Sequence, residues 1–147
     1  MYNNTEKFLD YLNGIGMNFF SYERKNEDDV LFHNESSNGV NLRTVIAFVG
    51  EQNIDVLYDI ATCTDVMKKE QIIQLLNKFN IESRLKFWLY DDGSIRAGFT
   101  YWGVVNEFDP ADFFKIYAIF LNELLKGEEV KKIMRIIWGW FLCLLGF

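Results

Sequence analysis

Residues 85–101, LKFWLYDDGSIRAGFTY, predict an antiparallel β-hairpin, because two runs of strand-forming residues flank an Asp-Asp-Gly turn at 91–93. A three-residue loop sets Leu89 opposite Ile95 and gathers the apolar side chains on one face. A two-residue loop would mix apolar and charged residues on both faces, since a slip of one residue exchanges the faces. The sequence therefore predicts the three-residue loop, with Gly93 in the left-handed conformation.

Further strand and helix patterns surround this hairpin. Strand patterns with a period of two occupy residues 17–24, 30–34, 42–49 and 54–61, and helical patterns occupy residues 5–13 and 67–79. A final helical region begins at Asp109-Pro110, and Gly127 bends or ends it before a second apolar stripe. The order helix, strands, helix, hairpin, helix predicts an α+β fold: an antiparallel sheet meander with helices packed on one face.

Length and composition exclude several classes of protein. The chain has 147 residues, of which 50% are hydrophobic and 17% aromatic. A chain of this size and composition buries a core of its own, so disordered and collagen-like proteins are excluded. We predict a single domain over residues 1–138, followed by an apolar C-terminal extension at 139–147.

The negative charge is concentrated in the first part of the chain. Residues 1–64 hold four Lys or Arg and ten Asp or Glu, whereas residues 65–147 hold eleven of each, which gives the net charge of −6. Nucleic-acid affinity comes chiefly from Lys and Arg that neutralise phosphates, so we predict no nucleic-acid partner. The acidic run Glu27-Asp28-Asp29 is interpreted as a solvated loop.

The two ends of the chain indicate a cytoplasmic protein without a transmembrane segment. Residues 1–6 contain neither a basic region nor an apolar run, so no signal peptide is expected. Residues 136–147 carry no charge. As a helix, however, such a segment spans about 18 Å, against the roughly 30 Å of a bilayer core. Cys63 and Cys143 lie far apart in the chain, as is typical of reduced thiols in the cytoplasm.

Motifs in the second half of the chain resemble those of the YbjN-domain family. The run LLNKFN at 75–80 resembles the Leu-Asn-x-x-Asn helix end of that family. As in the family, an aromatic strand at 86–90, an Asp-Gly hairpin and a returning strand follow, and the last helix fits as well. The resemblance covers residues 5–138 and implies the fold of type III secretion chaperones, which are commonly dimers that bind unfolded segments of partners. The family is described as a candidate sensory transduction regulator and defines no catalytic residues.

Side chains that could carry catalysis are few and isolated. His33 is the only histidine, and although Glu35 shares its strand face, a lone strand histidine is more typical of a solvent-facing polar residue. Cys63 and Cys143 have neither a CxxC partner nor a basic neighbour to activate a thiol. Asp91-Asp92 stand at turn positions that favour aspartate. We therefore predict a non-enzymatic protein with no cofactor and no metal site.

An aromatic surface is the predicted partner-binding site. The predicted contact residues are Trp88, Tyr90, Tyr101 and Trp102, joined by Trp140 and Phe141 of the C-terminal extension. Large aromatic side chains carry much of the binding energy at protein contacts. We expect a protein partner and a homodimer. The extension packs into its own domain, forms the dimer interface or contacts another surface, and truncation after residue 138 distinguishes these.

Two further sets of residues leave alternatives open. Asn77 and Asn80 at a helix end either satisfy free carbonyls or adopt the left-handed conformation there, or they form a polar recognition site. The alternative function is a small-molecule-sensing regulator with an apolar pocket between the sheet and the final helix. That pocket is predicted to be lined by Tyr58, Phe99, Phe113 and Tyr117. A closed cavity with convergent polar groups favours the regulator, and a solid core with an open apolar groove favours protein binding.

Overall fold

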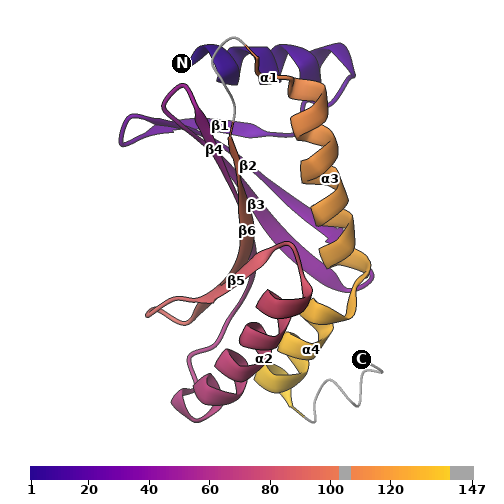
Figure 1. Ribbon diagram of the computed structural model, residues 1–147. Helices are drawn as coiled ribbons and strands as arrows, with labels where there is room; N and C mark the ends of the chain where they lie inside the picture. Colours follow the sequence, from indigo (N-terminus) through magenta and orange to yellow (C-terminus); the bar gives the residue numbers. More distant parts are fainter. Residues whose placement is uncertain (103–106, 140–147) are drawn as a thin grey trace.

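A computed structural model describes residues 1–102 and 107–139, which form a six-stranded antiparallel sheet with α-helices packed against it (Figure 1). The helices are α1 (Asn3–Gly14), α2 (Lys69–Glu82), α3 (Pro110–Lys126) and α4 (Glu128–Trp138), with a short 3₁₀ helix, η1 (Val66–Lys68), before α2. The strands are β1 (Ser21–Lys25), β2 (Asp28–Ser37), β3 (Val40–Val49), β4 (Asn53–Thr62), β5 (Lys86–Leu89) and β6 (Ser94–Trp102).

The strands lie in the spatial order β1-β2-β3-β4-β6-β5, and every neighbouring pair is antiparallel. The first four strands form a meander, and the β5–β6 hairpin then adds to β4 through β6. The predicted order of helix, strands, helix, hairpin and helix is confirmed. Gly127 ends α3, so the final helical region consists of two helices.

The β5–β6 hairpin has the predicted register. Leu89 pairs with Ile95 and Phe87 with Ala97, which confirms the three-residue loop. Gly93 has a φ of +88°, in the left-handed region predicted for it. A Cβ atom at this position would lie 2.3 Å from the Cys63 carbonyl oxygen, so glycine is required for space as well as for conformation.

Alternation along the central strands places one face of the sheet against the helices. On β3 and β4 alternate side chains are fully buried, Ile46 and Val56 among them. Helices α1 and α3 pack on this face, where the rings of Phe8 and Phe113 lie 5.1 Å apart. Helices α2 and α4 pack together farther along the sheet (Figure 1). The predicted placement of the helices on one face is therefore confirmed.

The sheet has two unlike ends. At the α1 end, α1 lies next to the turn between β3 and β4, and the two strands pair from this turn as far as Arg43 opposite Asp59. Beyond that pair, residues 40–42 of β3 and 60–62 of β4 do not pair with each other; we call this the split end. The pairing of β4 with β6 is irregular between Asp59 and Ala61. A bulge bends its strand, which explains why β4 diverges here from β3.

Candidate functional site

The face of the sheet turned away from the helices is not covered by any of the described elements. Its middle is apolar and half-buried, and consists of Val30, Phe32, Val45, Ala47 and Leu57. Charged side chains surround this middle: Glu23, Lys25, Arg43, Asp59 and Arg96. We call this surface the open face. A hollow of about 300 Å³ lies between its apolar and charged residues.

Three of the predicted partner-binding aromatics flank the open face. Trp88 and Tyr90 are 39% and 38% exposed, and Trp102 is 75% exposed. The guanidinium of Arg96 lies 4.7 Å from the centroid of the Tyr90 ring, which orients this ring on the open face. Trp88 lies opposite Arg96, whereas Trp102 lies six residues farther along β6, about 20 Å away at the usual rise of a strand. The structure therefore does not join these aromatics into one cluster.

Of the other three predicted contact residues, only Tyr101 is among the residues that the structure describes. Tyr101 lies on the helix-covered face, opposite Ile54, and its ring packs 5.3 Å from that of Phe113. Placing Tyr101 on the same face as Trp102 was wrong, because adjacent residues of a strand point to opposite faces. Trp140 and Phe141 lie outside the described residues.

The four residues predicted to line a ligand pocket belong to the helix-covered face. Tyr58, Phe113 and Tyr117 are buried core residues, and Phe99 packs against Phe120 with ring centroids 5.0 Å apart. The Tyr58 and Tyr117 rings stack 5.9 Å apart, and the Tyr58 hydroxyl donates to the Tyr117 carbonyl oxygen at 2.8 Å. These side chains fill the core against each other.

Burial keeps both tyrosines of this stack in the neutral form. Loss of solvation raises the pKa of Tyr117 to about 12, although a hydrogen bond with the Thr44 hydroxyl opposes the rise. Burial raises the pKa of Tyr58 further still. Neutral phenols paired in this way stabilise the core and offer no base or nucleophile at neutral pH.

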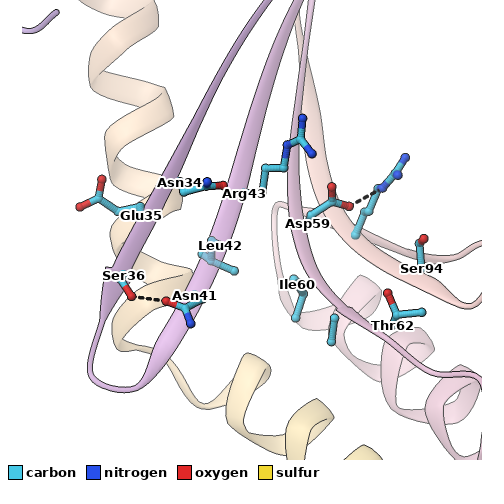
Figure 2. A pocket seen from close by; sticks show the side chains of 12 residues that line it. Asn34, Glu35, Ser36, Asn41, Leu42, Arg43, Asp59, Ile60, Thr62 and Ser94 are labelled. Atoms are coloured by element: carbon cyan, nitrogen blue, oxygen red, sulfur yellow. Dashed lines mark hydrogen bonds and ion pairs between the residues drawn. The ribbon is translucent and has the colours of Figure 1, made fainter. Parts of the chain in front are cut away.

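The separation of β3 and β4 at the split end opens a cleft through the sheet. Figure 2 shows the two strands diverging below Arg43 and Asp59, with Asn41 on one side and Thr62 on the other. The cleft has a volume of about 570 Å³. Both polar and apolar side chains line it, and Asp59 accepts a hydrogen bond from Arg96 Nε at its upper edge (Figure 2). We call it the strand cleft.

A second, apolar cavity adjoins the strand cleft on the helix side of the sheet. It has a volume of about 220 Å³ and lies under the first turns of α4. Its walls are mainly apolar, with Val40 and Ile60 from the sheet and Val130 and Met134 from α4, and Lys131 and Asn41 also line it. Ile60 and Asn41 line both cavities, so the two are neighbours through the split in the sheet. We call it the α4 cavity.

The two asparagines at the end of α2 have different surroundings. Asn80 Nδ2 donates to the Phe87 carbonyl oxygen at 3.1 Å, and Asn80 Oδ1 accepts from the Phe87 N–H at 2.7 Å. This amide thereby satisfies backbone groups of β5, one of the two edge strands of the sheet. Asn77 is exposed one helical turn earlier. The contacts of Asn80 are thus structural, although they reach strand β5 and not the free carbonyls at the end of α2.

The acidic run at 27–29 is not a solvated loop, because Asp29 is fully buried at the α1 end. Its carboxylate accepts hydrogen bonds from the Tyr2 N–H, the Thr5 hydroxyl, the Tyr22 hydroxyl and the Arg24 guanidinium, all at 2.7–2.9 Å. Burial alone would raise the pKa of Asp29, but these four donors outweigh it and lower the pKa to about 2. We call these five residues the Asp29 network.

The residues considered for catalysis make contacts that belong to packing and to a turn. His33 Nε2 lies 2.8 Å from Glu35 Oε2, and the ring packs 4.4 Å from that of Phe19. Cys63 is buried, and Cys143 lies outside the described residues. In the hairpin turn, Asp92 accepts a hydrogen bond from the Ser94 N–H, which lowers the pKa of its carboxyl group.

Two kinds of feature are missing from residues 1–102 and 107–139. They contain no group of three or more His, Cys, Asp or Glu placed to hold a metal ion. Of the helices within these ranges, none is long and apolar enough to cross a membrane.

Comparisons of the chain with models of protein families, with curated proteins and with solved structures found no match.

Proposed function

We propose that this protein is a non-enzymatic, cytoplasmic binding module of the chaperone-like or regulatory kind, which acts through protein–protein contacts. The observation that carries the proposal is the open face, an apolar sheet surface that none of the described elements covers. Contiguous apolar surface with a charged rim is typical of protein interaction sites. The resemblance to the YbjN-domain family supports the same class of function.

The chemistry of the open face suits recognition of another protein. Phe32 and Leu57 offer apolar area at the centre, and exposed Trp88 offers a large ring at one side. Arg43 and Asp59 supply opposite charges at the rim, which favour a defined orientation of the partner. A second copy of the chain is one such partner, and a homodimer is part of the proposal.

Site-specific photo-cross-linking tests the proposal in cells. A benzophenone amino acid replaces Trp88 or Val49, both exposed on the open face, and, as the matched control, Ile119, which is 47% exposed on α3. We expect discrete protein adducts from the two open-face positions and none from position 119. An adduct of twice the chain mass identifies the homodimer, which light scattering on the purified chain measures independently. The same adducts from all three positions, or none from the open face, would contradict the proposal.

The α4 cavity favours the alternative function, a small-molecule-sensing regulator. It lies between the sheet and α4, whereas the pocket predicted from the sequence was lined by Phe113 and Tyr117, which belong to α3. Its volume of about 220 Å³ is smaller than the roughly 300–1,000 Å³ of typical ligand pockets, which makes this function the weaker candidate. Native mass spectrometry of the purified chain tests it: a bound small molecule supports the regulator, and the bare chain mass opposes it.

A further inference from the structure

We propose that the strand cleft binds an extended segment of a partner protein as an additional strand between β3 and β4. The inference rests on the protein-binding function proposed above and specifies the partner's chemistry. The partner segment carries one apolar residue flanked by acidic residues.

The backbone edges that line the strand cleft face each other without pairing. Continued from Arg43 and Asp59, the register would set residues 42, 41 and 40 opposite residues 60, 61 and 62, and none of these pairs forms. Each edge is paired on its far side only, β3 with β2 and β4 with β6. Along an antiparallel strand, alternate residues direct their N–H and C=O to each side. Both edges therefore present free backbone groups, the feature that allows another strand to add.

The length of the cleft fits a short strand. Three residues on each edge extend about 10 Å at the usual rise per residue. A segment of three or four residues therefore spans the unpaired part of both strands. The bulge at Ile60 bends β4 away and makes room between the strands, and the cleft volume of about 570 Å³ measures this room.

The α4 cavity provides a place for one side chain of the added strand. A strand in the split directs alternate side chains to the helix side, where Val40, Ile60, Val130 and Met134 form apolar walls. The cavity of about 220 Å³ lies directly beyond the strand cleft, because both cavities share Ile60 and Asn41. An apolar side chain such as leucine would lose its contact with water there.

Positive charge on the open-face side of the split favours acidic residues before and after that apolar residue. Arg43 and Arg96 both lie on the open face at the rim of the cleft, and Asp59 is the carboxylate between them. Asp59 pairs with Arg96. Arg43 contacts the Phe32 ring and, within the described residues, has no carboxylate at ion-pair distance. Glu35 also lines the cleft, but it belongs to the helix-covered face.

Peptide titration of the full-length chain tests the inference. The probes are three acetylated and amidated peptides, Thr-Glu-Leu-Glu-Thr, Thr-Lys-Leu-Lys-Thr and Thr-Glu-Ser-Glu-Thr, added to ¹⁵N-labelled protein up to about 2 mM, enough to detect a Kd near 1 mM. We expect the first peptide to shift the amide resonances of residues 40–42 and 60–62. The lysine and serine peptides should bind about ten-fold more weakly, since one meets Arg43 with like charge and the other leaves the α4 cavity empty.

A pair of arginine variants isolates the charge effect. Arg43→Ala should abolish most of the preference for the glutamate peptide over the lysine peptide, whereas Arg84→Ala, at an exposed arginine outside the cleft, should preserve it. Neither side chain is buried, so both variants are expected to fold.

Several outcomes would overturn the inference. Shifts confined to the open face around Phe32 and Leu57 would contradict strand addition but leave the binding-module function standing. Absence of any shift at the highest concentration would overturn it too, and the cross-linking yields would then show whether protein binding itself fails. Protection of the amides at 40–42 and 60–62 in the free protein would also overturn the inference, because the two edges would then already be hydrogen-bonded. Protection that rises with protein concentration identifies a second copy.

Discussion

The Asp29 carboxylate at the α1 end and the backbone edges at the split end differ in how fully they are hydrogen-bonded. At the α1 end, the Asp29 network joins the chain terminus, α1 and the β1–β2 hairpin through one buried carboxylate. At the split end, β3 and β4 separate, and their facing edges remain unpaired. β3 and β4 pair with each other at the α1 end, where the Asp29 network lies on the neighbouring strands β1 and β2, and they separate at the split end. Buried polar groups that are fully paired hold a fold together, and unpaired groups at a cleft are available to a partner.

A comparison of sheet edges supports the same conclusion. β5 is one of the two edge strands, and the Asn80 side chain occupies both the N–H and the C=O of Phe87 on it. An edge protected in this way resists the addition of another strand. The unpaired edges at 40–42 and 60–62 have no equivalent hydrogen bond across the gap from the described residues. The difference explains why the inferred binding site is the split and not β5.

The largest loss of stability is expected at Gly93, where the β5–β6 turn lies against the backbone of Cys63 just after β4. Gly93→Ala should lower the free energy of unfolding by about 3 kcal/mol, because the left-handed φ and the 2.3 Å approach of the new Cβ to the Cys63 carbonyl act together. Gly50→Ala is the matched control, since Gly50 also has a positive φ but has open space around it. It should cost about 1 kcal/mol. Equal losses in urea denaturation would show that the close contact with Cys63 is unimportant.

The next effect concerns the Asp29 network at the α1 end. Asp29→Asn should lower the free energy of unfolding by about 2–3 kcal/mol, because it removes a buried charge from four donors, Arg24 among them. Asp28→Asn, at the less buried neighbouring position, should change it by less than about 0.5 kcal/mol. Denaturant titration measures both. A loss at Asp28 as large as that at Asp29 would contradict the assigned network.

The same network predicts a pH dependence of stability. The pKa of Asp29 is lowered to about 2, below that of an aspartate in the unfolded chain, so the unfolded state binds the proton more readily. The stabilisation is complete above about pH 5 and is lost progressively as the pH falls towards 2, by about 2 kcal/mol in total. In the Asp29→Asn variant, the loss of stability that Asp29 causes between about pH 5 and pH 2 should disappear. An unchanged profile in the variant would assign the acid sensitivity to other carboxylates.

Two smaller changes in stability compare the α1 end and the split end directly. Thr5→Ala removes a buried hydroxyl that donates to Asp29 at 2.7 Å and should cost about 1–2 kcal/mol. Asn41→Ala removes an exposed side chain that accepts a hydrogen bond from Ser36 at the split end, and it should cost less than about 0.5 kcal/mol. Thermal denaturation of the two variants checks the difference. A reversed order would contradict the description of one end as closed and the other as open.

The local pattern of the sequence was enough to predict the elements and the hairpin register. Alternation through Leu89 and Ile95 selects one loop length, and the structure confirms it, together with the left-handed Gly93. The same alternation places Tyr101 on the buried face with Ile95, but grouping it with Trp102 by adjacency overlooked this signal. Periodicity therefore contains more information about the faces of the sheet than the aromatic composition of a segment does.

Features that depend on contacts between distant parts of the chain could not be predicted from the local sequence pattern. Asp29 stands in an acidic run, and its burial depends on donors from Tyr2 and Thr5, which come close only when α1 docks on the sheet. The strand cleft likewise depends on a bulge at Ile60, a residue that fits a regular strand as well as an irregular one. In both cases, tertiary packing decides what the local residue types leave open.

Native-state hydrogen exchange of the free, full-length chain tests the contrast between the two ends most directly. We predict that the amides of β3 and β4 in the paired region, around Ile46 and Val56, exchange only through global unfolding. At the split end, at least one amide within 40–42 and one within 60–62 should exchange nearly as fast as in an unstructured peptide. Uniformly slow exchange along both strands would contradict an open cleft, and with it the site inferred for a partner strand.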